Sequence, residues 1–243
     1  MLYGRQLIVI GVTSMVKVKW FGHSAFAVKI GNKVFLVDPW ITNPKSPIKD
    51  LSELSIEPDY ILVTHDHGDH LGNTVELLKL YKKAKAVAIF EIANQIAEKL
   101  SDPNRIIDGN IGGPIRLGDG FFVVLTTATH SSGSGSPTGV VFGREGEVVY
   151  HAGDTGLTYD MKLVGELYKP LVALLPIGGH YTMGPKEAAK AAELIKPKYA
   201  IPMHYGTFPV LWGKPEDFKN EVAKLAPEVE VIILSPGEEV ELT

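Results

Sequence analysis

Metal-capable side chains are concentrated in one short run that follows a predicted strand: His65, Asp66, His67, Gly68, Asp69 and His70. Imidazoles at positions i and i+2 can point the same way while the chain is still extended. Gly68 then permits a sharp turn, so that Asp69 and His70 can face a second cation. Two cations about 3.5 to 4 Å apart can hold one hydroxide and polarise one substrate oxygen, which is the chemistry of binuclear hydrolases. Without a cation, so many polar groups at a strand end would be costly.

Five further histidines and one aspartate lie in Gly-, Ser- or Asp-rich loops after predicted strands, where functional sites are often built: His23, His130, His151, Asp154, His180 and His204. For His23 the structural and functional interpretations are both open, and His151 favours a structural or ligand-orienting role. His180 favours a functional role, because it follows the predicted strand at residues 171–175 on a glycine-rich loop. Asp154 alone is compatible with a plain turn.

The composition limits both the metal site and the partners. The 243 residues contain no cysteine, so any metal must be held by His and carboxylate groups. Such ligands accept Zn, Mn or Fe, and the ligand type alone does not select the cation. The net charge of -4 gives no bulk attraction to nucleic acid or anionic lipid. We therefore expect a cytoplasmic protein with a small-molecule substrate and with neither a nucleic-acid nor a membrane partner.

The first residues are predicted to lie outside the folded domain. The apolar run at residues 7–12 follows a single Arg5 and is too short and too poorly flanked for a signal peptide. Met15 stands directly before the first alternating strand. We interpret residues 1–14 as an N-terminal extension or a mis-assigned start, and residues 15–243 as a single domain.

The candidate ligands depend on an alternation of short strands and helices for their positions. The chain opens with three strands, of which the last two are joined by Gly31-Asn32, a hairpin signal. A β-meander followed by αβ units appears twice, and no linker composition separates the halves. The strands are predicted at residues 16–20, 25–30, 33–37, 60–63, 86–90, 121–125, 138–142, 147–150, 171–175, 199–202 and 230–234, and the helices at residues 74–83, 91–100, 159–168, 185–195 and 215–225.

The pattern His-x-His-x-Asp-His after a strand resembles the metal-binding signature of the metallo-β-lactamase superfamily. The rest of that signature follows in order at His130, Asp154 and His204, and this order favours Asp154 as a ligand. Four shorter motifs are similar to a largely uncharacterised subfamily of metal-dependent hydrolases that includes the L-ascorbate-6-phosphate lactonase-like proteins: residues 20–26, 38–40, 176–184 and 201–205.

The resemblance implies a binuclear site with seven ligands: His65, His67 and His130 for the first cation, Asp69, His70 and His204 for the second, and Asp154 as the bridge. A hydroxide held between the cations would attack a carbonyl carbon or a phosphorus atom, and Asp69 could also orient this nucleophile. His180 is the other predicted catalytic residue. Three neighbours are candidates for orienting ligands, donating a proton or contacting substrate: His23, His151 and Tyr181. Zn is the first choice of metal, with Mn or Fe as alternatives.

The resemblance also implies the fold and the reaction. We predict an α/β protein with a four-layer αββα sandwich, in which two mixed sheets face each other and the metal site lies at one edge between the halves. The predicted reaction is hydrolysis of a small-molecule ester, lactone or phosphorylated metabolite. The lack of cysteine departs from class B β-lactamases with a cysteine ligand, and His67 stands where the diiron flavoprotein reductases of the superfamily have Glu.

Two alternative functions stay open. The first is an RNase Z-like or cyclic-nucleotide phosphodiesterase, against which the net charge and the lack of a long inserted arm for tRNA argue. The second is a metal-binding scaffold without catalysis, against which the complete ligand set argues. Self-association into a homo-oligomer is a further expectation, because related proteins often self-associate.

Overall fold

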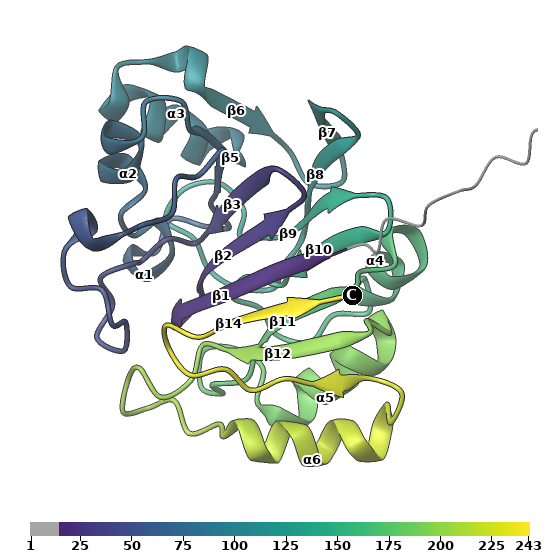
Figure 1. Cartoon of the computed structure of the whole chain (residues 1–243). Helices are drawn as coiled ribbons and strands as arrows, with labels where there is room; N and C mark the ends of the chain where they lie inside the picture. The colour runs from purple at the N-terminus through teal and green to yellow at the C-terminus, as the bar shows by residue number, and fades with distance from the viewer. Residues whose placement is uncertain (1–14) are drawn as a thin grey trace, which may run out of the picture.

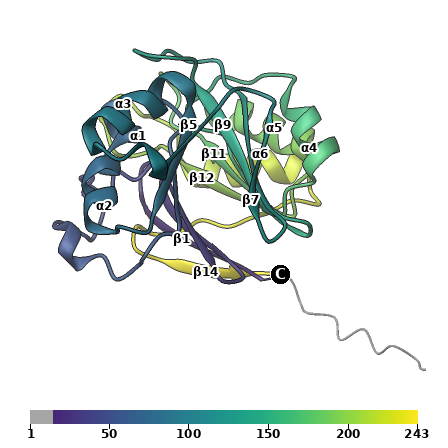
Figure 2. The ribbon, with the colours of Figure 1, turned by 90° about the horizontal axis from the view of Figure 1, so that it is seen from above.

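The computed structural model describes residues 15–243, so the prediction for residues 1–14 lies outside the described residues. Two seven-stranded sheets face each other, and helices cover their outer sides (Figure 1). Seen from above, the helices of residues 68–100 and those of residues 161–225 lie on opposite sides of the sheets (Figure 2). The predicted four-layer αββα sandwich of the α/β class is confirmed. No helix in the described part is long and apolar enough to cross a bilayer.

The first sheet has the order β14-β1-β2-β3-β4-β5-β6, with strands Val16–Gly22 (β1), Ala25–Ile30 (β2), Lys33–Val37 (β3), Tyr60–Leu62 (β4), Lys85–Ile89 (β5), Ile106–Gly109 (β6) and Glu239–Leu242 (β14). Strands β2 and β3 form the hairpin that Gly31-Asn32 predicts. In β1, Val16 and Val18 are buried, whereas Lys17 between them is partly exposed. This alternation is expected for a strand with one buried face.

The second sheet has the order β13-β12-β11-β10-β9-β8-β7, with strands Pro114–Gly118 (β7), Phe121–Thr127 (β8), Thr138–Arg144 (β9), Glu147–His151 (β10), Val172–Pro176 (β11), Tyr199–Met203 (β12) and Glu230–Val231 (β13). Its central strands β9, β10, β11 and β12 are buried on both faces. Phe142 and Leu174 belong to the core shared with the first sheet, whereas Val141 and Leu175 pack in a second core with the outer helices. Burial on both faces explains why these strands are almost continuously apolar.

The helices are Gly68–Leu71 (α1), Thr74–Leu80 (α2), Phe90–Leu100 (α3), Met161–Tyr168 (α4), Pro185–Ile195 (α5) and Pro215–Leu225 (α6), with 3-10 turns at Leu51–Glu53 and Pro103–Arg105. Pro185 and Pro215 begin their helices at the position where a missing N–H is harmless. Helix α5 buries Ala188, Ala192 and Ile195 against the second sheet, as its spacing predicts.

Strands β6, β7 and β14 and the short helix α1 are not among the elements predicted from the sequence. The three missed strands lie at sheet edges, where residues are half-buried or exposed and the hydrophobic signal is weak. The predicted last strand at residues 230–234 was too long, because β13 ends at Val231 and the chain then crosses to pair β14 with β1. Similarly, α2 ends at Leu80 rather than at residue 83.

Candidate metal centre

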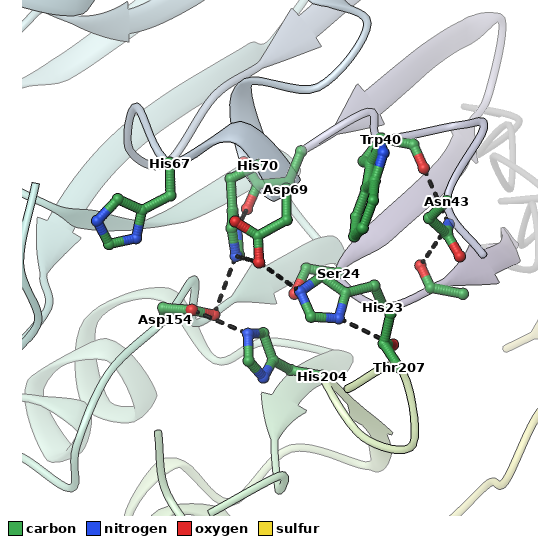
Figure 3. A network of polar contacts seen from close by, with 12 residues as sticks. His23, Ser24, Trp40, Asn43, His67, Asp69, His70, Asp154, His204 and Thr207 are labelled. Carbon is green, nitrogen blue, oxygen red and sulfur yellow. Dashed lines mark hydrogen bonds and ion pairs between the residues drawn. The ribbon is translucent and has the colours of Figure 1, made fainter. Parts of the chain in front are cut away.

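The candidate site lies at one edge of the sandwich, where loops from both sheets meet (Figure 3). From the first sheet, the chain leaves β4 and turns into α1, which carries Asp69 and His70. From the second sheet, three loops bring in one side chain each, after β8, β10 and β12. The structure thereby brings together all seven side chains that the resemblance implies as ligands: His65, His67, Asp69, His70, His130, Asp154 and His204.

One group, the three-histidine cluster, consists of His65, His67 and His130. His65 Nε2 lies 3.0 Å from His67 Nδ1. The ring centroid of His130 is 5.2 Å from each of the other two ring centroids. One ring nitrogen of each residue lies within 4.8 Å of the others, so the three could bind one ion. His65 is buried, whereas His67 and His130 are partly exposed.

A second group, the four-residue cluster, consists of His23, Asp69, His70 and His204, whose candidate ligand atoms also lie within 4.8 Å of one another. Asp69 Oδ2 is 3.9 Å from His70 Nε2 and 2.9 Å from His23 Nε2. The rings of His23 and His204 are 4.1 Å apart between centroids. The structure therefore places His23 beside the three residues that the resemblance implies for the second cation.

Asp154 contacts both clusters, and Figure 3 shows its carboxylate beside His70 and His204. Its Oδ2 is 3.0 Å from His204 Nε2 and 3.6 Å from His130 Nε2, whereas its Oδ1 is 3.2 Å from His70 Nε2. Its carboxylate therefore contacts members of both clusters, and its role as a bridge between two cations stays a prediction.

The central donors fit divalent cations. His70 Nε2 and Asp154 Oδ1 are buried, and neither makes a hydrogen bond within the described residues. Buried polar atoms without partners cost free energy. A cation bound by both atoms would remove that cost, and imidazole nitrogen together with carboxylate oxygen suits Zn, Mn or Fe.

Asp38, which is not among the site residues predicted from the sequence, orients one histidine of each cluster. Its Oδ2 lies 2.7 Å from His70 Nδ1 and also accepts a 2.7 Å hydrogen bond from Thr64 Oγ1. Thr64 Oγ1 is in turn 3.0 Å from His65 Nδ1. With the Nδ1 proton of each ring directed at these oxygens, both Nε2 lone pairs face the site. The signal in the sequence was the Asp38-Pro39-Trp40 turn, where Asp38 has a φ of 44°.

The buried carboxylates Asp38 and Asp154 carry negative charge that a cation beside them would balance. Burial lowers the pKa of His65 to about 3 and of His23 to about 4, which keeps both rings neutral. The pKa of His70 is raised well above its usual value, because the neighbouring carboxylates Asp154 and Asp38 outweigh the opposing effect of burial. In the absence of metal, a proton on His70 would supply the positive charge that a cation would supply at this place.

A cavity of about 300 Å³ opens onto both clusters. Tyr181 lines it and is 55% exposed, so this side chain can contact a substrate. Phe208 and Ser131 also line it, although the sequence analysis singled out neither residue. Their only sequence signal is that each closely follows a ligand histidine.

The predicted catalytic role of His180 gains no support from its position. Its side chain is exposed and packs edge-on against Tyr181, with ring centroids 4.5 Å apart. Unlike Tyr181, it is not among the residues that line the cavity. The glycines before it have a packing role, because a Cβ on Gly178 would lie 2.1 Å from the His204 carbonyl oxygen and one on Gly179 would lie 2.4 Å from the Trp212 ring.

His151 joins the two sheets, and both of its ring nitrogens make hydrogen bonds. Its Nε2 donates a 2.9 Å hydrogen bond to the carbonyl oxygen of Ser24, and its Nδ1 accepts a 3.1 Å hydrogen bond from the Gly153 N–H. Because both ring nitrogens are already used, His151 has no lone pair left for a cation.

The loop after His130 is held in place by Asp66, another residue that the sequence analysis left without a role. Asp66 Oδ1 accepts hydrogen bonds from Ser132 Oγ at 2.9 Å and from the Gly133 N–H at 2.7 Å. A Cβ on Gly133 would lie 2.9 Å from Asp66 Oδ2. Asp66, which stands between the candidate ligands His65 and His67, thus fixes the segment that follows the candidate ligand His130.

Comparisons with known proteins agree with this geometry. Residues 33–205 match the β-lactamase superfamily domain. The chain is 54% identical over 229 residues to a UPF0173 metal-dependent hydrolase of Staphylothermus marinus, covering 92% of this chain and 98% of that protein. It is 50% identical over 223 residues to the corresponding protein of Hyperthermus butylicus, with coverages of 91% and 97%.

Solved structures give the same result. Igni18, a metallo hydrolase from Ignicoccus hospitalis, superposes with a TM-score of 0.87 at 42% identity and covers 95% of this chain and 99% of its own. The metallo-β-lactamase fold protein YhfI from Bacillus subtilis shares the fold at 14% identity, with a TM-score of 0.72 and coverages of 94% and 99%. The chain therefore belongs to the β-lactamase superfamily and is one of its metal-dependent hydrolases.

Proposed function

We propose that this protein hydrolyses a small-molecule ester or lactone with water activated at a two-cation site. The observation that carries the proposal is the convergence of two ligand clusters on Asp154, whose two carboxylate oxygens contact histidines of both. Two bound cations would lower the pKa of a water molecule and take up the negative charge that develops on the substrate oxygen. Zn is our first choice of cation, with Mn or Fe as alternatives.

The protein's own groups divide the remaining work. Asp38 fixes the orientation of two ligand histidines, and the buried His70 and Asp154 keep the centre of the site away from bulk water. Tyr181 and Phe208 form an aromatic wall of the cavity, against which an apolar or sugar-like substrate can pack. Because Tyr181 lines the cavity, we expect its phenol to donate a hydrogen bond to a substrate oxygen.

The cavity favours uncharged substrates. Among the described residues that line the cavity, there is neither a Lys nor an Arg. Proteins usually hold the phosphate group of a substrate with Lys or Arg side chains. We therefore rank carboxylic esters and lactones above phosphorylated lactones, and both above phosphodiesters.

A substrate screen tests the proposal. The metal-free protein is loaded with Zn or Mn and assayed on an aryl ester, a panel of lactones, a sugar-phosphate lactone and bis(nitrophenyl) phosphate. We expect turnover of an ester or lactone that a chelator abolishes and added metal restores. Dominant turnover of the phosphodiester would replace the proposal by a phosphodiesterase. A metal-loaded protein that is inert on every substrate would favour a metal-binding scaffold.

A further inference from the structure

His23 lies in the turn between β1 and β2, and the structure holds this turn firmly. Its carbonyl oxygen accepts hydrogen bonds from Trp20 Nε1 and from the His204 N–H, each of 3.0 Å. Both His23 and His204 have left-handed backbone conformations, with φ of 53° and 57°. Such conformations are uncommon for residues other than glycine and often mark functional positions. The turn thus places a fully buried imidazole against the end of β12.

The distance from His23 Nε2 to its neighbour Asp69 resembles the distances between the predicted ligand atoms. His23 Nε2 lies 2.9 Å from Asp69 Oδ2. Two other pairs of predicted ligand atoms have nearly the same separation: 3.0 Å between His65 Nε2 and His67 Nδ1, and 3.0 Å between His204 Nε2 and Asp154 Oδ2. His23 therefore stands in the same relation to its neighbours as the predicted ligands do to theirs.

The outer nitrogen of His23 has the partner that a metal-binding histidine needs. Its Nδ1 lies 3.0 Å from Thr207 Oγ1 (Figure 3). The Thr207 hydroxyl proton can be directed at the Tyr205 carbonyl oxygen, 3.5 Å away, which leaves an oxygen lone pair to accept the Nδ1 proton. The Nε2 lone pair of His23 then faces the four-residue cluster, as Asp38 arranges for His70.

We propose that His23 is a ligand of the second cation, together with Asp69, His70 and His204. This inference rests on the proposed two-cation function and adds a ligand to the seven that the resemblance implies. The competing interpretation is that Nε2 carries a proton and donates a hydrogen bond to Asp69, so that His23 only positions that carboxylate. The two interpretations differ in whether the cation itself contacts His23.

Stepwise binding of Co(II) to the metal-free protein separates the two interpretations. In His23→Gln, the side-chain amide reaches the place of Nε2 and can still donate a hydrogen bond to Asp69. We expect the affinity for one of the two Co(II) ions to fall by more than about 100-fold, beyond the range for partners outside the metal shell, whereas the other ion binds as before. His151→Gln is the matched control, because His151 is equally buried but has both nitrogens hydrogen-bonded to protein.

Thr207→Val is a gentler variant that keeps the imidazole. Loss of the acceptor for His23 Nδ1 is expected to lower the affinity for the same Co(II) ion by about 10- to 100-fold. If both variants bind two Co(II) ions with wild-type affinity, the inference is overturned and the proposed function stands. If the wild-type protein itself binds no second ion, the two-cation function and the role of His23 are overturned together.

The proton NMR spectrum of the Co(II)-loaded wild-type protein gives an answer that does not depend on a variant's stability. A ligand imidazole retains one exchangeable N–H proton, and the unpaired electrons of the bound ion shift its resonance far outside the normal range. We expect one such resonance to be lost in His23→Gln and kept in His151→Gln. Loss of only a weakly shifted resonance would show that His23 is a hydrogen-bond partner and not a ligand.

Discussion

The two ligand clusters differ in how firmly the fold holds them. In the three-histidine cluster, His67 and His130 are partly exposed and border the cavity. In the four-residue cluster, all three histidines are buried, and the outer nitrogens of His70 and His23 contact Asp38 and Thr207. Both clusters therefore border the cavity, but the histidines of the four-residue cluster lie deeper in the core than His67 and His130 do. We expect a chelator to remove the cation of the three-histidine cluster first.

Asp154→Asn should have the largest effect, because this carboxylate contacts both clusters. Loss of its charge weakens both cation sites at once. We expect metal content to collapse and kcat/KM to fall by at least about 10³-fold, since several kcal/mol of charge stabilisation are lost. Elemental analysis and steady-state kinetics check this, with the exposed Asp217→Asn as control. Full metal content with only a small loss of turnover would contradict the bridging role.

Asp38→Asn should have an intermediate effect that reaches both clusters. Asp38 contacts His70 directly and His65 through Thr64. We expect each cation to bind about 10- to 100-fold more weakly, the usual range for residues that orient metal ligands. Thr64→Val sharpens the comparison, because it should lower only the cation affinity of the three-histidine cluster. Equal weakening of both cations by Thr64→Val, measured by competition with a chelator, would show that the clusters are not held independently.

The stability of the metal-free protein should depend on pH in the direction set by its buried histidines. Burial lowers the pKa of His65 to about 3, of His23 to about 4, and that of His151 below the ordinary 6.5. Below pH 6.5 these histidines bind protons in the unfolded chain but stay neutral in the folded protein. The free energy of unfolding therefore falls as the pH falls. His70 acts in the opposite sense, but its raised pKa makes stability fall with rising pH only above about 6.5.

Each such histidine contributes a slope of about 1.4 kcal/mol per pH unit below pH 6.5. We expect His151→Gln to make the stability of the metal-free protein less dependent on pH below 6.5, because burial lowers the pKa of the His151 ring. Urea unfolding between pH 7 and pH 5 measures the slope. An unchanged slope in His151→Gln would mean that His151 does not stay neutral in the folded protein.

Variants at the mouth of the cavity should have the smallest effects. Tyr181 lines the cavity and His180 does not. We expect Tyr181→Phe to lower kcat/KM several-fold, as for the loss of one hydrogen bond of about 1 kcal/mol, with full metal content. His180→Ala should lower kcat/KM less than Tyr181→Phe does. The reverse ranking in steady-state assays would return His180 to the catalytic role that the sequence suggests.

The sequence predicts those parts of the molecule that local patterns determine. The buried strands of the second sheet are apolar on both faces, and the histidine motif follows β4, so their identity can be recognised within a few residues. The edge strands β6, β7 and β14 are half-exposed, and their pairing depends on distant partners: Lys17 of β1, for example, pairs with Glu241. Local patterning carries little of that information.

The same distinction applies to the site. The candidate ligand histidines belong to a compact motif or to an ordered series after it, so their convergence in space could be predicted. The roles of Asp38 and Thr207 arise from contacts between segments far apart in the chain, because Asp38 meets His70 and Thr207 meets His23 only after folding. The preference for His180 over Tyr181 followed from the loop sequence, which does not determine which of two adjacent side chains faces the cavity.

The most direct test of the two-cluster account is the metal content of protein purified without added metal, before and after limited treatment with a chelator. The account predicts two divalent cations per chain, of which the cation of the three-histidine cluster is removed first and the other is retained. Near-zero metal that soaking cannot restore, or a single cation per chain under all conditions, would contradict it.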